Sequence, residues 1–236
     1  MISVAMATYN GEKYIKRQIE SILRNLGPKD ELVISDDGSK DRTLDIIRSF
    51  RDDRIKLFEG PGGSIHKNFE NAIRNCSGDI IFLSDQDDFW YPGKVAAVLK
   101  EFDRTGADLV EHDAVVKTDD GSILYPSFFR YRRVRRGPLR NIMRNTYHGC
   151  LMAFRAELRE KILPIPTEGA LPDQWIGILA DHYGKVSFLD EKLMDYYRHP
   201  GNASSFKHLS FRRQLMDRLK LIHNYCRRVN NIVHDK

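Results

Sequence analysis

Four consecutive polar residues, three of them aspartates, offer the most specific chemistry in this sequence. They are Asp85-Gln86-Asp87-Asp88, and they follow residues 79–84, an apolar run typical of a buried strand. Three carboxylates this close repel one another unless a cation neutralises them, and a divalent ion shared with a diphosphate removes both charge problems. Acids also favour helix N-termini, where Asp88 could cap. The pattern favours a functional role for Asp85 and Asp87, and it leaves Asp88 open between ligation and capping.

Alternating strand-like and helix-like segments position these residues. Apolar runs typical of strands occur at residues 2–7, 31–35, 55–58, 79–84 and 107–110, and segments with helical apolar spacing separate them. Strands joined by helices pair in parallel, so the sequence predicts an open α/β sheet. Ligands bind beyond the carboxyl ends of such strands. Polar clusters follow three of them: Thr8-Tyr9-Asn10, Asp36-Asp37 and the aspartate box.

The second half of the chain has weaker patterns. We predict a strand at residues 148–154, a helix at 174–180, and a mobile loop at 130–144, which are rich in arginine and have no apolar period. Near the end, an apolar stripe predicts a long amphipathic helix. The stripe consists of Phe211, Leu215, Leu219, Ile222, Cys226, Val229 and Val233.

Length and charge set the broad class. A chain of 236 residues can bury one sizeable core, so one domain with a tail from residue 206 to 236 fits better than two domains. The net charge of +5 is uneven: residues 207–236 hold eight Lys or Arg and two Asp, and residues 130–144 hold seven Arg and no acid. This asymmetry indicates an anionic partner, which could be lipid headgroups, diphosphates or nucleic acid.

Several classes of protein are disfavoured. Cys76, Cys150 and Cys226 form neither a metal spacing nor a disulfide framework, which favours a reducing compartment, the cytoplasm. The first residues lack the basic lead of a signal peptide. No glycine fingerprint follows the first strand, and no phosphate-loop lysine motif is present.

Three motifs in order resemble family 2 of the GT-A glycosyltransferases. They are Ala7-Thr8-Tyr9-Asn10-Gly11, then Asp36-Asp37-Gly38-Ser39-Lys40-Asp41, then the aspartate box with Trp90. Members with this box include many bacterial rhamnosyl- and glucosyltransferases of surface polysaccharide assembly, such as that of O-antigen or capsule. The resemblance covers residues 1–205. It implies a GT-A fold, an open and mostly parallel Rossmann-like sheet flanked by helices, with a nucleotide-binding half at 1–110 and an acceptor-binding half at 111–205.

The resemblance also implies roles on the nucleotide side. Thr8, Tyr9 and Asn10 would contact the nucleoside, and Asp37 would accept the ring N–H of a uracil or thymine base. Alternatively, Asp36 could contact the base in place of Asp37, or it could simply be an acidic residue of the turn. Asp85 and Gln86 would face the donor near its ribose. Lys67 and Asn68 are similar in place to base-contacting residues, although solvated helix-start residues would look the same.

For metal, catalysis and acceptor the resemblance points to later residues. Asp87 would bind Mn²⁺ or Mg²⁺ with His199, from the box Tyr197-Arg198-His199-Pro200-Gly201-Asn202. Asp173 would be the catalytic base, although Pro172 stands where the family often has Glu or His, and Asp173 could instead be an N-cap. The acceptor side would hold His148, Gly149 and Trp175, the last primarily a packing residue. His112 and Asp113 could face donor hydroxyls or form a turn.

The expected function is an inverting, metal-dependent transfer of a hexose or deoxyhexose. The donor would be a UDP- or dTDP-sugar and the acceptor a hydroxyl of a saccharide, lipid-linked at the inner face of the cell membrane, where the basic terminal helix would contact anionic lipid. A nucleotidyltransferase is the rival enzyme, but it would need a glycine-rich turn after the first strand. A basic nucleic-acid-binding protein is the rival of another class, and it leaves the aspartate box unexplained.

Overall fold

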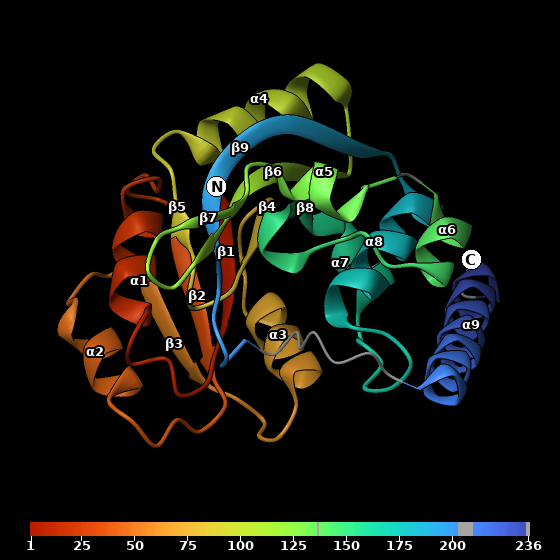
Figure 1. The fold of residues 1–236 in the computed structure, drawn as a ribbon, viewed down its shortest axis with the longest axis horizontal. Helices are drawn as coiled ribbons and strands as arrows, with labels where there is room; N and C mark the ends of the chain where they lie inside the picture. The colour runs from red at the N-terminus through yellow and green to blue at the C-terminus, as the bar shows by residue number, and fades with distance from the viewer. Residues whose placement is uncertain (136, 203–209, 235–236) are drawn as a thin grey trace.

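A computed structural model of the chain describes residues 1–135, 137–202 and 210–234. Within these residues a nine-stranded sheet runs through the centre, with helices on both of its faces (Figure 1). The strand order is β3-β2-β1-β4-β8-β6-β9-β5, and β7 pairs with β6. The α/β class expected from the sequence is therefore confirmed.

The first half of the sheet is parallel and matches the predicted pattern. Its strands are β1 (Ile2–Thr8), β2 (Glu31–Asp36), β3 (Ile55–Glu59) and β4 (Ile80–Ser84), connected by α1 (Ile15–Leu23), α2 (Thr43–Ser49) and α3 (Ile65–Arg74). In register, Thr8 pairs with Asp36 and Met6 with Ser84. The carboxyl ends of β1, β2 and β4 therefore meet at one edge, where their polar clusters come together.

Each face of the sheet has its own apolar core. Along β1, Val4 and Met6 belong to one core and Ala5 to the other, because successive side chains of a strand point to opposite faces. Helices α1 and α4 (Lys94–Thr105) cover the first core, and α3 and α8 (Pro172–Tyr183) cover the second. Both faces are thus buried, which explains why the first strands are almost continuously apolar.

The second half of the sheet mixes parallel and antiparallel pairs. It contains β5 (Phe89–Trp90), β6 (Leu109–Thr118), β7 (Ile123–Tyr125), β8 (Met152–Arg155) and β9 (Val186–Arg198). β6 and β9 are parallel, whereas β8 runs antiparallel to β4 and β6, and β5 antiparallel to β9. The predicted strand at 148–154 is shorter, because a 3-10 turn (Gly149–Leu151) precedes β8.

The prediction of a mobile loop at residues 130–144 is wrong over most of its length. Helices α5 (Phe128–Arg132) and α6 (Pro138–Met143) lie here, and the short 3-10 turn Ala156–Leu158 and α7 (Arg159–Ile162) follow β8. The Ser127 hydroxyl caps α5 by accepting the Arg130 N–H. Phe128 and Ile142 are buried. Each helix thus has a single fully buried apolar side chain, too little to produce a period in the sequence.

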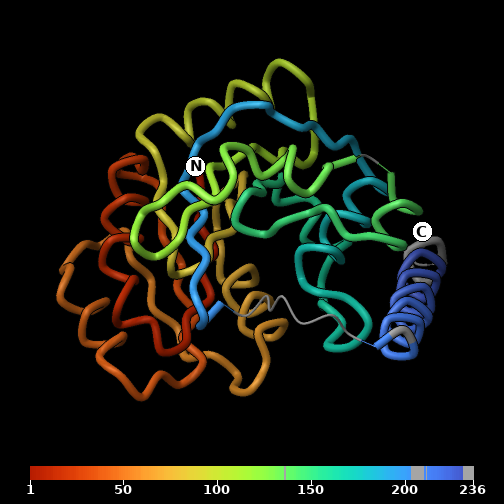
Figure 2. The backbone as a smooth tube through the Cα atoms, viewed as in Figure 1, coloured from red at the N-terminus to blue at the C-terminus, as the bar shows by residue number. Residues whose placement is uncertain are grey.

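The predicted long helix is α9 (Phe211–His234), at the far edge of the molecule (Figure 2). Leu221 is buried in the second core, and Arg228 donates to the Pro164 carbonyl at 3.0 Å. No helix among the described residues is long and apolar enough to cross a membrane. The predicted boundary at 205/206 lies outside the described residues, as do the side chains of Phe211 and Val233.

Candidate active site

Asp36 is an internal brace at the end of β2. Its carboxylate accepts hydrogen bonds from the Thr8 hydroxyl at 2.8 Å, and from the Ser39 hydroxyl and N–H at 2.7 and 2.8 Å. Thr8 and Asp36 are both buried. The Thr8 hydroxyl is therefore used within the protein, and Asp36 has the turn role that was its alternative.

Asp37, the preferred base reader, lies one residue further out and is only partly buried. Its two carboxylate oxygens accept the N–H of Gly62 at 2.7 Å and of Ser64 at 3.2 Å. It thereby fixes the glycine loop before α3. Carboxylate oxygens have further lone pairs, so Asp37 can still accept from a ligand.

Asn10 and Gln86 also act as braces. The Gln86 side-chain amide pairs with both backbone groups of Tyr9, each at 3.0 Å. Asn10 has a left-handed backbone with φ 47°, and its side-chain oxygen accepts the Lys40 N–H at 2.8 Å. The loop after β1 is thus held by two amides, while the Tyr9 ring is 54% exposed and can contact a ligand.

Lys67 and Asn68 differ sharply although they are neighbours on α3. Lys67 is exposed, as a solvated helix-start residue would be. Asn68 is buried and donates to the Thr8 carbonyl at 3.1 Å, and among the described residues its side-chain oxygen has no partner. Asn68 therefore contacts the end of β1, whereas Lys67 lies at the exposed surface beside it.

Asp87 and His199 are brought together across 112 residues of chain. The Asp87 carboxylate lies 2.8 Å from His199 Nε2, and it accepts a second bond from the Asn202 amide at 3.2 Å. The His199 ring stacks on Tyr14, with centroids 4.4 Å apart. This pair offers the oxygen and imidazole ligands that were expected from the sequence.

Asp88 is not a helix cap. It precedes β5 rather than a helix, and α4 begins only after Gly93. One carboxylate oxygen of Asp88 accepts the Tyr197 N–H at 3.1 Å, and the other is buried without a partner among the described residues. The capping alternative is therefore wrong. Burial, reinforced by the charges of Asp87 and Asp85, raises the pKa of Asp88 well above its usual value.

Asp85 completes the acidic group at the end of β4. Oxygens of Asp85, Asp87 and Asp88 lie within 4.8 Å of one another. Burial, then the charges of Asp87 and Asp173, raise the pKa of Asp85 to about 7. The carboxylates are therefore not all ionised near neutral pH unless positive charge is supplied, which agrees with the expectation of a cation at this place.

Asp173 lies in the first turn of α8, close enough to Asp85 to act on its pKa. It is not the N-cap, which is Leu171. One Asp173 oxygen accepts the Gln174 N–H at 2.6 Å, and the other lies 3.8 Å from His148 Nδ1. Burial raises the pKa of Asp173 to about 6. A carboxyl group with such a pKa can accept a proton at neutral pH.

His148 and Gly149, which were predicted for the acceptor side, lie beside Asp173. The His148 ring stacks on Phe128 at 4.7 Å and meets Tyr196 edge-on at 4.6 Å. Burial lowers the pKa of His148 to about 3, so the ring is neutral. A Cβ at Gly149 would lie 3.7 Å from that of Asp173, an ordinary van der Waals contact, so the turn passes directly beside the Asp173 side chain.

Trp175 and the pair His112 and Asp113 lie in the interior instead. Trp175 is 1% exposed and donates to the Ile162 carbonyl at 2.7 Å, so its assignment to the acceptor side is wrong and its packing role remains. Asp113 accepts the Ser127 hydroxyl at 2.6 Å. His112 and Asp113 are both buried, which favours the structural alternative for them.

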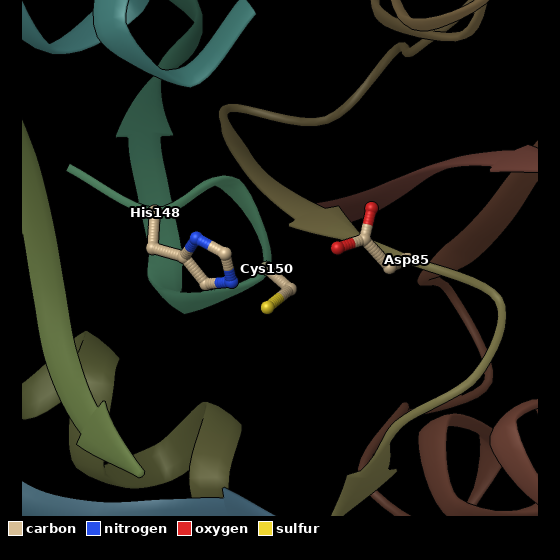
Figure 3. Close-up of side chains that lie close together, drawn as sticks. All are labelled: Asp85, His148 and Cys150. Carbon is tan, nitrogen blue, oxygen red and sulfur yellow. The ribbon is translucent and has the colours of Figure 1, made fainter. Parts of the chain in front are cut away.

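Sequence reasoning missed two residues beneath the aspartate box. Lys94, 1% exposed at the start of α4, donates to the Cys150 carbonyl at 3.2 Å and lies over the Trp90 ring at 3.8 Å. Burial lowers the pKa of Lys94 to about 7. The Cys150 thiol shares a space with Asp85 and His148 (Figure 3). A lone lysine and a lone cysteine carry no spacing, so nothing in the sequence could have indicated either.

Comparison with known proteins decides the family. The model of glycosyl transferase family 2 matches residues 3–163. The chain belongs to this family. The chain is 29% identical over 222 residues to an uncharacterized glycosyltransferase of Nostoc sp., covering 85% of this chain and 66% of that protein. It is 27% identical over 159 residues to the Escherichia coli UDP-Glc:alpha-D-GlcNAc-diphosphoundecaprenol beta-1,3-glucosyltransferase WfgD, covering 64% of this chain and 58% of WfgD.

Solved structures share the GT-A fold of this glycosyltransferase. S. aureus TarS (residues 1–349), in complex with UDP-GlcNAc, superimposes with a TM-score of 0.72 at 22% identity, over 89% of this chain and 62% of that one. The mannosyltransferase PcManGT from Pyrobaculum calidifontis, in complex with GDP-Man and Mn²⁺, gives 0.60 at 22% identity, over 83% and 56%. The chain thus spans less than two thirds of the length of these two structures.

Proposed function

We propose that this chain is an inverting, metal-dependent transferase that moves a hexose or deoxyhexose from a UDP- or dTDP-sugar to a hydroxyl of a saccharide acceptor, in bacterial surface polysaccharide synthesis. One observation carries the proposal. The Asp173 carboxyl group, whose pKa burial raises to about 6, lies close enough to the aspartate box to raise the pKa of Asp85. This places a proton acceptor and an anion-bridging site side by side, which transfer to an alcohol requires.

The acidic group fits a divalent ion. The buried Asp88 oxygen without a partner and the crowding of three carboxylates both indicate missing positive charge. Asp87 and His199 would hold Mn²⁺ or Mg²⁺, with Asp85 beside them, and the ion would stabilise negative charge on the departing diphosphate. The other residues of the site would bind and orient the donor and the acceptor, and Asp173 would accept the proton.

Asp173 would accept the acceptor's proton. The Gln174 N–H holds one of its oxygens, with the Asn145 amide 3.4 Å away, and so fixes the direction of the carboxylate. As the acceptor oxygen bonds to the anomeric carbon, the bond from that carbon to the diphosphate breaks and Asp173 takes the hydroxyl proton. A single displacement of this kind inverts the anomeric configuration.

The nucleotide would bind at the ends of β1 and β2. The exposed Tyr9 ring offers a stacking surface, and Asp37 and Asn68 have acceptor oxygens at the same edge. Lys67 at the rim would supply positive charge. TarS in complex with UDP-GlcNAc and the UDP-Glc donor in the name of WfgD support a nucleotide diphosphate donor.

Two measurements test this proposal. The melting temperature should rise with UDP or dTDP together with Mn²⁺, since a ligand at 100 times its dissociation constant adds about 2.7 kcal/mol. With a matching sugar nucleotide and a saccharide acceptor, the protein should release the free nucleoside diphosphate. The anomeric configuration of the product, measured by NMR, should be inverted relative to the donor. Pyrophosphate release from a nucleoside triphosphate and a sugar 1-phosphate would favour the nucleotidyltransferase rival. Retention of configuration would exclude the mechanism, and salt-dependent DNA binding without nucleotide binding would favour the nucleic-acid rival.

The terminal helix would place the enzyme at the cytoplasmic face of an anionic membrane, where a lipid-linked acceptor is found. The α9 face that carries Leu221 packs on the body, whereas Leu215, Leu219 and Ile222 are 45%, 53% and 40% exposed. The helix has six Lys or Arg and one Asp. Three of these cations have partners within the protein: Lys220 pairs with Glu168, Arg213 pairs with Asp217, and Arg228 binds the Leu163 and Pro164 carbonyls. An exposed apolar stripe beside the remaining arginines fits an anionic bilayer.

Flotation with vesicles tests the membrane contact. The full chain should float with vesicles of phosphatidylglycerol but not with phosphatidylcholine alone. The Leu219→Asp and Ile222→Asp double variant should lose flotation and keep its melting temperature, because both side chains are exposed. The matched control is Leu124→Asp on β7, where the leucine is 44% exposed. Unchanged flotation of the double variant would show that the stripe does not contact the membrane. A wild-type chain that dimerises through these residues and does not float would assign the stripe to a subunit interface.

A further inference from the structure

Three side chains of different chemistry face a common space behind the aspartate box. Figure 3 shows Asp85 from the end of β4, and His148 and Cys150 from the turn that precedes β8. One carboxylate oxygen, one imidazole nitrogen and the thiol sulfur all lie within 4.8 Å of one another. The proposed transfer gives Asp85 and His148 roles on the donor and acceptor sides, but it uses neither the thiol nor this juxtaposition.

Polar atoms around this space are unsatisfied. His148 Nε2 is buried and has no partner among the described residues, although Nδ1 of the same ring lies 3.8 Å from Asp173. Asp88 is 0% exposed, and its second oxygen also lacks a partner among those residues. Burial, then the charges of Asp88 and Asp85, raise the pKa of the Cys150 thiol, so the sulfur lies beside both carboxylates. Orphaned buried acceptors around a thiol are costly unless something binds them.

We propose that Asp85, His148 and Cys150 form a binding site for a borderline-soft divalent cation, of which Zn²⁺ is the representative. Zinc takes carboxylate oxygen, imidazole nitrogen and thiolate sulfur at about 2.0 to 2.3 Å, in a tetrahedron. Ligand atoms 4.8 Å apart or less can reach such a centre through small side-chain rotations. Asp88 or a water supplies the fourth ligand.

The ligand types separate this site from the one proposed at Asp87 and His199. Thiolate and imidazole select zinc, whereas Mn²⁺ and Mg²⁺ prefer oxygen-rich sites. The Cys150 thiol gives up its proton to solvent as its sulfur binds the metal, so the bound form carries a thiolate. Lys94, hydrogen-bonded to the Cys150 carbonyl, holds the turn in place beneath the metal.

Occupation of this site inhibits the enzyme, a consequence that rests on the proposed function. Zinc withdraws the Asp85 carboxylate from the donor, and it fixes the His148 ring that lies beside Asp173. Zn²⁺ is therefore expected to act as an inhibitor competitive with the sugar nucleotide, in the presence of saturating Mn²⁺.

Cobalt binding tests the site without any need for enzymatic activity. The full chain titrated with Co²⁺ should develop the near-ultraviolet charge-transfer band of a cobalt thiolate, and Zn²⁺ should abolish it. Cys150→Ser should lose the band. The matched controls Cys76→Ser and Cys226→Ser should keep it, because Cys76 is buried behind α3 and Cys226 is exposed on α9.

A second variant protects the test against misfolding of Cys150→Ser. His148→Gln keeps the thiol but loses a proposed ligand. It should therefore still bind Co²⁺ but at least about 10- to 100-fold more weakly, since loss of a group that merely orients a ligand already weakens binding by that factor. Absence of the band in the wild type, its persistence in Cys150→Ser, or its loss in Cys226→Ser would each overturn the proposal. Cobalt binding without transferase activity would retain the site and reject the proposed function instead.

Discussion

The two sides of the site differ in how their polar groups are satisfied. On the nucleotide side, defined by the loops after β1 and β2 with Gln86, the side chains of Thr8, Asn10, Asp36 and Gln86 bond within the protein. The reacting side is defined by Asp85, Asp88, His148, Cys150 and Asp173. Here buried atoms of Asp88 and His148 have no hydrogen-bond partner among the described residues, and the pKa values of the titratable groups are displaced. The nucleotide side is therefore pre-formed, whereas the polar groups of the reacting side need a bound ligand to satisfy them. Substitutions should therefore have opposite effects on stability on the two sides.

The largest effect is expected for Asp173→Asn on turnover. Loss of a positioned general base typically slows a reaction by about 10²- to 10⁴-fold, and we expect a fall in kcat within that range. Affinity for UDP or dTDP, measured by calorimetry, should stay unchanged because Asp173 lies outside the nucleotide side. Asp103→Asn, an exposed position on α4, is the matched control and should retain full activity. Equal turnover of both variants would remove Asp173 from the mechanism.

Asp36→Asn should damage the nucleotide side as structure. The amide would lose charge-assisted bonds from Thr8 and from two groups of Ser39. Hydrogen bonds to charged groups contribute about 1.5 to 3 kcal/mol each, so we expect a loss of about 3 kcal/mol in the free energy of unfolding by urea denaturation. A variant as stable as the wild type would show that this side is not held by Asp36.

Asp173→Asn should instead stabilise the metal-free protein at neutral pH. The folded-state pKa of Asp173 is about 6, above the ordinary value for an aspartate, so its stabilising contribution is full below about pH 4 and is lost as the pH rises through 6. Asparagine does not ionise. Relative to the wild type, the free energy of unfolding of the variant should rise by up to about 3 kcal/mol as the pH increases from 4 to 7.5. A stability difference that does not change with pH would contradict the raised pKa.

The same titration should appear in the kinetics. Protonated Asp173 cannot accept a proton, so kcat/KM should fall tenfold per pH unit below about pH 6, whereas a base with an ordinary aspartate pKa would stay active to about pH 4. A pH-rate profile at saturating Mn²⁺ checks this. Constant kcat/KM from pH 7 to 5 would mean that another group takes the proton.

The smallest effect is expected for Lys67→Ala. The side chain is exposed, and surface substitutions usually change stability by less than about 0.5 kcal/mol. If Lys67 contacts the donor, its removal should weaken nucleotide binding several-fold and leave kcat unchanged. Lys40→Ala is a matched exposed control in the neighbouring loop. Equal nucleotide affinity of the two variants would make Lys67 a solvated helix residue.

The sequence predicted the parallel half of the fold well because local signals and tertiary structure agree there. Strands β1, β2 and β4 are buried on both faces, so they read as apolar runs followed by polar residues. The approach of Asp87 to His199 was also expected, through the resemblance. By contrast, β9 contains the exposed Asp190, Glu191 and Lys192 and has no alternation, so it could not be recognised.

The errors share a cause. Asp88 looked like a cap because acids often precede helices, but here a two-residue strand follows, paired with a partner more than 100 residues away. Trp175 was expected to be primarily a packing residue and also to lie on the acceptor side, but α8 buries it in the second core. Cys150 and Lys94 meet the aspartate box only in three dimensions. Contacts between distant segments leave no trace in one sequence.

The long strand β9 links several parts of the site. It pairs with β6 through most of its length, its Asp195 pairs with Phe89 just after the box, its Tyr197 N–H binds Asp88, and His199 follows its end. One inserted residue upstream of Tyr197 would move the rest by about 3.3 Å and turn alternate side chains over. The loops after β1 and β3 are held instead by side-chain hydrogen bonds, such as those of Gln86 with Tyr9 and of Asp37 with Gly62. Chimeric enzymes with new donor preferences should therefore tolerate exchange of the loop residues 60–64 when Asp37 is kept, whereas junctions placed inside residues 186–199 should yield protein without a working catalytic centre.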